Sequence, residues 1–104
     1  MKKTNCKLNP EKVISLLKKN HDILVGAYKI KNLGLFGSVA RNEATARSDI
    51  DFLVEFMVPV GLFHLSRLAR FLETLFHRRV DLVIKDSVRP EFREGIEKEL
   101  IHAA

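Results

Sequence analysis

Two segments of the chain decide its fold. Residues 33–41 read LGLFGSVAR, and residues 48–56 read SDIDFLVEF. Successive side chains of a β-strand point to opposite faces, so the second segment predicts a strand with Asp49 and Asp51 on one face and β-branched and aromatic residues on the other. Two such carboxylates repel each other unless a cation lies between them, and hard divalent cations are commonly held by carboxylates together with substrate phosphates. The pattern therefore predicts a metal and phosphate site.

The Gly37-Ser38 pair ends the first segment, and ten residues separate it from Asp49. Glycine allows close approach of the backbone, and serine offers a hydroxyl group, both suited to phosphate oxygens. Arg41 and Arg47 are further candidates for phosphate contacts, because guanidinium groups bind phosphate strongly. The alternatives are an ordinary turn for the Gly-Ser pair and solvated surface arginines.

A third carboxylate, Asp81, lies in the apolar stretch RRVDLVI of residues 78–84. An aspartate in such a stretch is costly to bury unless it is paired or bound to metal. If this strand lies beside residues 49–56, the three aspartates can hold two cations ~3.5–4 Å apart, the arrangement used for in-line nucleotidyl displacement. Asp81 would then bind the metal on the nucleophile side and help to deprotonate the attacking hydroxyl.

Hydrophobic periodicity and turn residues predict an alternation of helices and strands. This order indicates an α/β (α+β) domain with a small sheet covered by helices. In the helix over 61–77, Phe63 and Phe71 fall at the margin of the apolar stripe, where they cover a neighbouring element or a partner. The expected elements are helix 10–27, strand 32–36, short helix 38–42, strand 49–56, helix 61–77, strand 80–84 and helix 90–101.

Composition limits the remaining possibilities. The chain has 104 residues, 46% of them hydrophobic, which predicts one domain over residues 1–104 with a flexible tail at 1–8. A net charge of +5 favours phosphate-bearing ligands without requiring nucleic acid. The single cysteine, Cys6, excludes an internal disulfide and fits a reducing cytoplasm. No apolar run approaches ~20 residues, so we expect neither a membrane span nor a signal peptide.

The spacing G-S-x(10)-D-x-D, followed by one aspartate on a later strand, resembles the minimal nucleotidyltransferases (MNT) of the DNA polymerase β-like superfamily. The resemblance covers about residues 30–100. It implies a mixed sheet flanked by helices, bound Mg²⁺ and ATP as substrate. With three aspartates in the site, we expect a pair of Mg²⁺ ions. Many such proteins are antitoxins that transfer AMP onto a tyrosine of a helical HEPN ribonuclease toxin, so a HEPN-type toxin is the expected partner.

The resemblance also assigns roles to individual residues. Gly37 and Ser38 correspond to the triphosphate-binding turn, and Arg41 matches a basic position often found after it. Asn42 replaces a glycine that is often found next, and asparagine tolerates left-handed backbone better than most residues. The metal ligands implied by the resemblance are Asp49, Asp51 and Asp81.

Three functions are compared on this basis. The first is Mg²⁺-dependent transfer of AMP to the toxin, and the second is neutralisation of the toxin by binding alone. The third is nucleotidyl transfer to RNA or a small molecule, which the chain has little room to support unless a homodimer forms the acceptor site. Arg78 and Arg79 precede the Asp81 strand, where they steer ATP, face an acidic partner or interact with a helix dipole.

Overall fold

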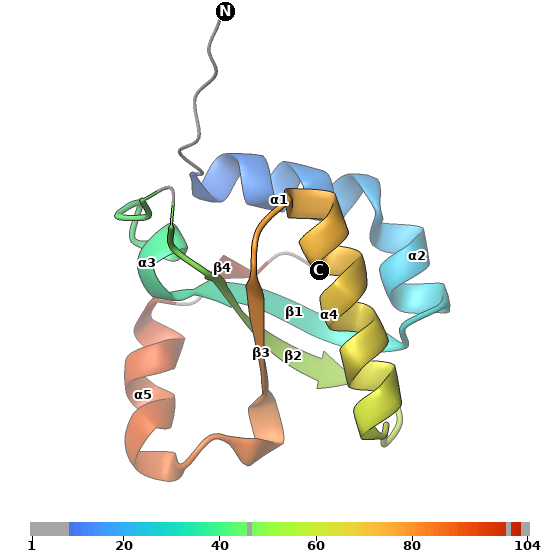
Figure 1. Ribbon diagram of the computed structural model, residues 1–104. Coiled ribbons are helices and arrows are strands. Elements are labelled where there is room, and N and C mark those ends of the chain that lie inside the picture. The colour runs from blue at the N-terminus through green and yellow to red at the C-terminus, as the bar shows by residue number, and fades with distance from the viewer. Residues whose placement is uncertain (1–8, 46, 100, 103–104) are drawn as a thin grey trace, which may run out of the picture.

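The computed structural model describes residues 9–45, 47–99 and 101–102, so the tail predicted at residues 1–8 lies outside the described residues. Figure 1 shows how the helices and strands are arranged. The helices are α1 (Pro10–Lys19), α2 (His21–Gly26), α3 (Gly37–Ala40), α4 (Leu62–Phe76) and α5 (Pro90–Glu99), together with the short 3₁₀ helix η1 (Lys85–Ser87). The strands are β1 (Ile30–Phe36), β2 (Ile50–Phe56), β3 (Val80–Ile84) and β4 (Ile101–His102).

The strands form one mixed sheet in the order β3-β2-β1-β4. β1 runs antiparallel to both β2 and β4, whereas β2 and β3 are parallel neighbours. Parallel neighbours need a crossover connection, and α4 supplies it between β2 and β3. A small mixed sheet with helices around it confirms the predicted α+β fold class.

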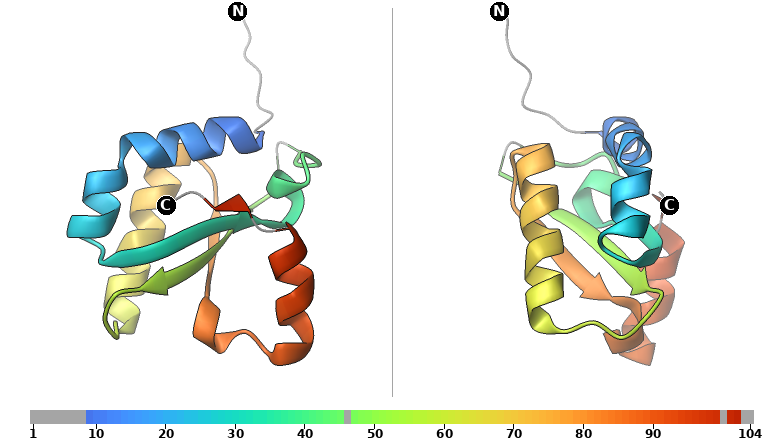
Figure 2. Two further views of the ribbon diagram at one scale, coloured as in Figure 1. Left: turned by 180° about the vertical axis from the view of Figure 1, so that it is seen from behind. Right: turned by 90° about the vertical axis from the view of Figure 1, so that its right-hand side faces the viewer.

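The helices divide between the two sides of the sheet. In Figures 1 and 2, α1, α2 and α4 lie together on one side, and α5 lies away from them, beside β1 and α3. The core fills the space between the sheet and helices α1, α2 and α4. There the ring of Phe52 on β2 lies 6.0 Å from that of Phe76 on α4. Alternate residues of β2 enter this core, so Asp51 faces the other side. The other core side chains include Val13, Leu17, Leu24, Leu33, Leu35, Ile50, Val54, Leu68 and Leu72.

The prediction of one helix over residues 10–27 is wrong, because the helix breaks at Asn20. The side-chain amide of Asn20 donates a hydrogen bond to the carbonyl of Leu16 over 2.8 Å, and its backbone N–H bonds to Leu17 over 3.1 Å. Asparagine competes in this way with regular helical hydrogen bonds. The chain therefore turns there and continues as α2.

The other predicted elements are present with shifted ends. β1 begins at Ile30 instead of residue 32, β2 begins at Ile50 instead of residue 49, and the short helix begins at Gly37. Helices α4 and α5 end within two residues of the predicted ends, and β3 matches its predicted range. Neither η1 nor β4 was expected from the sequence pattern.

Within the described ranges, no helix combines the length and the apolar character needed to cross a membrane.

Candidate active site

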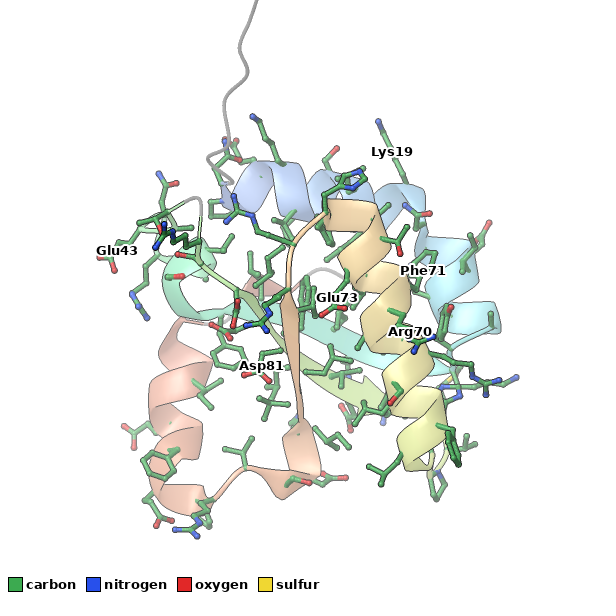
Figure 3. All side chains as sticks on the ribbon, in the orientation of Figure 1. Lys19, Glu43, Arg70, Phe71, Glu73 and Asp81 are labelled. Atoms are coloured by element: carbon green, nitrogen blue, oxygen red, sulfur yellow. The ribbon has the colours of Figure 1, made fainter. Side chains whose placement is uncertain are left out.

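Asp51 and Asp81 are direct neighbours across the parallel strands β2 and β3. The residues that flank each aspartate along its strand pack against the core, so both carboxylates project from the opposite face of the sheet. Figure 3 shows Asp81 beside β3, on the side of the strand away from α4. Neighbouring strands lie about 4.8 Å apart. The two carboxylates are therefore close enough to repel each other and to share a cation.

Gly37 lies directly against the carboxylate of Asp51. The preceding residue, Phe36, pairs with Asp51 in the antiparallel register of β1 and β2. A Cβ atom at Gly37 would overlap Oδ2 of Asp51 and approach its Cγ to 3.0 Å. Gly37 also has a φ of 79°, in the left-handed region that favours glycine. Both constraints require glycine here, so the turn places backbone without a side chain against the carboxylate.

Hydrogen bonds within the chain hold the turn after β1. The N–H of Arg41 donates to the carbonyl of Gly37 over 3.1 Å, and the N–H of Glu43 donates to that of Ser38 over 2.8 Å. Asn42 takes a left-handed φ of 61°, as its replacement of a glycine requires. The half-buried Ser38 is thus held next to Gly37, at the end of β1 that meets Asp51.

Asp49 is the predicted ligand that the structure does not gather with the other two. It is exposed and precedes the first residue of β2, Ile50. In the part of the chain that the structure describes, no group of three or more His, Cys, Asp or Glu side chains is arranged to hold a metal ion. Two hard carboxylate donors beside a glycine turn nevertheless fit Mg²⁺, which is commonly held by one or two carboxylates plus substrate phosphates. The role of Asp49 stays a prediction.

Arg41 and Arg47, the predicted phosphate contacts, both lie on the connection between α3 and β2. Nε of Arg41 forms an ion pair with Oε1 of Glu43 over 2.9 Å, and both side chains are exposed. Arg47 is exposed, and its backbone N–H donates to Oγ1 of Thr45 over 3.2 Å. An ATP phosphate would have to compete with Glu43 for Arg41, so the two arginines stay predictions.

Arg78 has a structural role that the sequence analysis did not include. Its Nη1 donates to the carbonyl of Thr45 over 2.7 Å and to that of Ser48 over 3.2 Å. These contacts tie the connection that leads to Asp49 onto the start of β3. The pattern of side chains gives no signal for them, because both acceptors are backbone carbonyls.

Glu73 of α4 is a second positioning residue that the sequence analysis missed. Its Oε2 accepts a hydrogen bond from the N–H of Val80 over 3.1 Å, and Figure 3 shows Glu73 on α4 and Asp81 on β3. Val80 precedes Asp81, so this bond fixes the start of the strand that carries the aspartate.

Comparison with known proteins identifies the family of this chain. The model of the nucleotidyltransferase domain family matches residues 11–102, which include all the predicted site residues. The chain belongs to this family. The resemblance to nucleotidyltransferases inferred from the aspartate spacing is thereby confirmed, and so is the predicted class of enzyme.

Relatives of this nucleotidyltransferase include two archaeal proteins. A Methanocaldococcus jannaschii protein, whose name provisionally assigns it protein adenylyltransferase activity, is 40% identical over 88 residues, covering 84% of this chain and 90% of the relative. The protein adenylyltransferase MntA of Thermococcus cleftensis is 33% identical over 95 residues, covering 91% of this chain and 96% of the relative. Among solved structures, a toxin–antitoxin complex with AMP-PNP matches with a TM-score of 0.67 at 26% identity, over 93% of this chain and 73% of that one.

Proposed function

We propose that this nucleotidyltransferase uses Mg²⁺ to transfer AMP from ATP to a tyrosine hydroxyl of a cognate HEPN-type toxin, and so acts as its antitoxin. The observation that carries the proposal is the direct pairing of Asp51 with Asp81, next to Gly37. A glycine-serine turn suits phosphate oxygens, a metal site needs hard oxygen donors, and here the two adjoin.

The proposed reaction is an in-line displacement at the α-phosphorus of ATP. The tyrosine oxygen forms a bond to that phosphorus, the bond to the bridging oxygen breaks, and pyrophosphate leaves. Mg²⁺, when bound, would neutralise phosphate charge and lower the pKa of the acceptor hydroxyl. Asp51 and Asp81 would hold the metal, with Asp49 as the third ligand. Gly37 and Ser38 would contact the triphosphate, and Asp81 would accept the proton of the hydroxyl.

The protein acceptor rests on the relatives. The Thermococcus cleftensis relative is named a protein adenylyltransferase, and it matches nearly the full length of this chain. A related solved structure is a toxin–antitoxin complex with AMP-PNP, an analogue of ATP. Together with the resemblance to MNT antitoxins, these support AMP as the transferred group and a toxin as the acceptor.

The transfer can be tested with ATP labelled at the α-phosphate, Mg²⁺ and the purified product of the adjacent reading frame. We expect label on a tyrosine of that protein, located by mass spectrometry. Asp51→Asn and Asp81→Asn keep the side-chain shape and remove one charge, so each should lower the transfer rate at least about 100-fold. Asp22→Asn removes the same charge from α2, on the other side of the sheet, and should leave the rate unchanged.

A second candidate, neutralisation by binding alone, is supported by the exposure of Leu62 and Phe63 at the start of α4. A folded Asp51→Asn/Asp81→Asn variant that still protects cells from the toxin would favour this candidate. Loss of protection with binding retained would favour the enzyme. Absence of label on the acceptor with the folded wild-type protein would refute the transfer.

A further inference from the structure

Helix α4 has an inner and an outer face of different character. Leu68, Leu72 and Phe76 of the inner face are buried in the core, and the ring of Phe71 packs 5.3 Å from that of Tyr28. Phe63, which the sequence analysis placed at the same margin as Phe71, is 86% exposed. Of these two phenylalanines, one thus covers a neighbouring element, and the other covers nothing in the described structure.

Phe63 belongs to a stripe that we call the α4 outer face, made of Phe63, Ser66, Arg67 and Arg70. These residues follow each other at steps of three, one and three, so they lie on one side of the helix. All four are exposed, and they line a shallow depression of about 460 Å³. In the view of Figure 3, Arg70 lies on α4, and Asp81 lies on the opposite side of β3.

Within the described residues, no acidic group balances the charge of the α4 outer face. Among residues 9–45, 47–99 and 101–102, no carboxylate forms an ion pair with Arg67 or Arg70. The nearest acid along the helix, Glu73, is bonded to the N–H of Val80 instead. Like charges three or four residues apart destabilise a helix slightly. Two adjacent cations with no acid therefore fit an acidic ligand.

A further apolar side chain is exposed at the start of α4. Leu62, the neighbour of Phe63 in the chain, is 81% exposed. Exposed phenylalanine and arginine residues on one face of a helix are the residue types enriched at the centre of protein–protein interfaces. Phe63 and the two arginines would also suit a single-stranded nucleic acid, whose bases stack on aromatic rings. The aliphatic Leu62 beside them adds apolar surface that favours a protein.

We infer that the α4 outer face docks an acidic segment of the acceptor protein that carries an apolar anchor for Phe63. The inference rests on the proposed function, since it assumes a protein acceptor. The face lies across the sheet from Asp51 and Asp81, so a docked segment leaves the ATP site open. Docking there raises the affinity for the acceptor without taking part in the chemistry.

The test compares acceptor binding with turnover, using the product of the adjacent reading frame as the probe. Phe63→Ala and Arg67→Glu/Arg70→Glu should each weaken binding, measured calorimetrically without ATP, at least about tenfold. The KM for the acceptor should rise by a similar factor, with kcat at saturation and ATP binding unchanged. Because these side chains are exposed, circular dichroism should show intact folding. Lys12→Glu/Lys19→Glu on α1 makes the same change of net charge and should bind as the wild type.

The outcomes distinguish failure of the docking face from failure of the proposed function. Wild-type transfer combined with unchanged binding by both α4 variants overturns the docking face alone. Failure of both the wild type and Asp51→Asn to bind the acceptor overturns the docking face together with the protein acceptor. Suppose instead that the wild type binds a fluorescent single-stranded RNA that the α4 variants no longer bind. If those variants still bind the acceptor protein, the face is a nucleic-acid site and the inference is wrong.

Discussion

Asn32 of β1 donates a hydrogen bond from its side-chain amide to Oε1 of Glu55 on β2, over 2.7 Å. Nζ of Lys85 lies 3.8 Å from the same carboxylate, and Nζ of Lys31 lies 3.9 Å from it. The hydrogen bond from Asn32 is the main cause that lowers the pKa of Glu55 from its ordinary value of 4.5, desolvation opposes it, and the charges of Lys85 and Lys31 add to the lowering. Glu55 thus joins β1, β2 and η1 on the face of β2 that carries Asp51.

This cluster predicts a pH dependence of stability. A carboxyl group with a lowered pKa in the folded state stabilises the protein above its unfolded pKa, and this contribution is lost as the pH falls through the folded value. Glu55→Gln should therefore lower the free energy of unfolding at neutral pH, and its difference from the wild type should vanish well below pH 4.5. Urea unfolding across this range measures the effect. Glu91 is an exposed carboxyl on α5. If Glu91→Gln changed the stability with the same pH profile, the pH dependence could not be assigned to the contacts of Glu55.

Gly37→Ala tests the contact between the turn and Asp51. The added Cβ overlaps the carboxylate, and the φ of 79° strains any residue other than glycine. We expect a loss of about 1–2 kcal/mol from the backbone alone. The displaced carboxylate should slow AMP transfer by about 100-fold. Urea unfolding and labelled-ATP assays measure the two effects.

Gly26→Ala is the matched control for that substitution. A Cβ at Gly26 meets nothing within 4 Å, and the residue lies in helix α2. Alanine is favoured over glycine in a helix by up to about 1 kcal/mol, so this variant should be as stable as the wild type or more so, with full activity. Equal losses in both variants would mean that the contact with Asp51 has no special importance.

Arg78→Ala should loosen the connection between α3 and β2. Two hydrogen bonds from a charged donor to Thr45 and Ser48 are lost, at a cost of about 1–3 kcal/mol. Hydrogen exchange should rise in residues 43–48 more than in α1, and Arg78→Lys should recover part of the protection. Arg79 is exposed, and in the described structure its side chain makes no hydrogen bond. Arg79→Ala should thus change stability by less than about 0.5 kcal/mol, and an equal effect of both substitutions would refute the role of Arg78.

The sequence predicts the parts of the site that depend on local pattern. Alternation on each strand is enough to place Asp51 and Asp81 on faces away from the core, and the range of β3 follows from the same pattern. Their direct pairing is not predicted, because the register of two parallel strands depends on how α4 crosses over and packs.

Interactions with backbone atoms escape the sequence pattern. Arg78 binds two carbonyl groups, and Glu73 binds an N–H group, so neither has a complementary side chain that would reveal its role. The break at Asn20 has the same origin, since its side chain bonds to a carbonyl within the helix. Once the parallel pairing of β2 and β3 is known, however, the two strand starts must meet, and the closeness of Arg78 to Ser48 follows.

His77→Gly should stabilise the protein. His77 ends α4 with φ 55° and ψ 42°, a left-handed conformation that costs about 1–2 kcal/mol for a residue with a Cβ atom. Glycine adopts it freely but loses more backbone entropy on folding, so the expected gain is about 0.5–1 kcal/mol. The midpoint of urea unfolding measures it. His77→Ala removes the imidazole and keeps the Cβ, so it should give no gain; equal stabilisation by both variants would show that the ring, and not the backbone, is the source of strain.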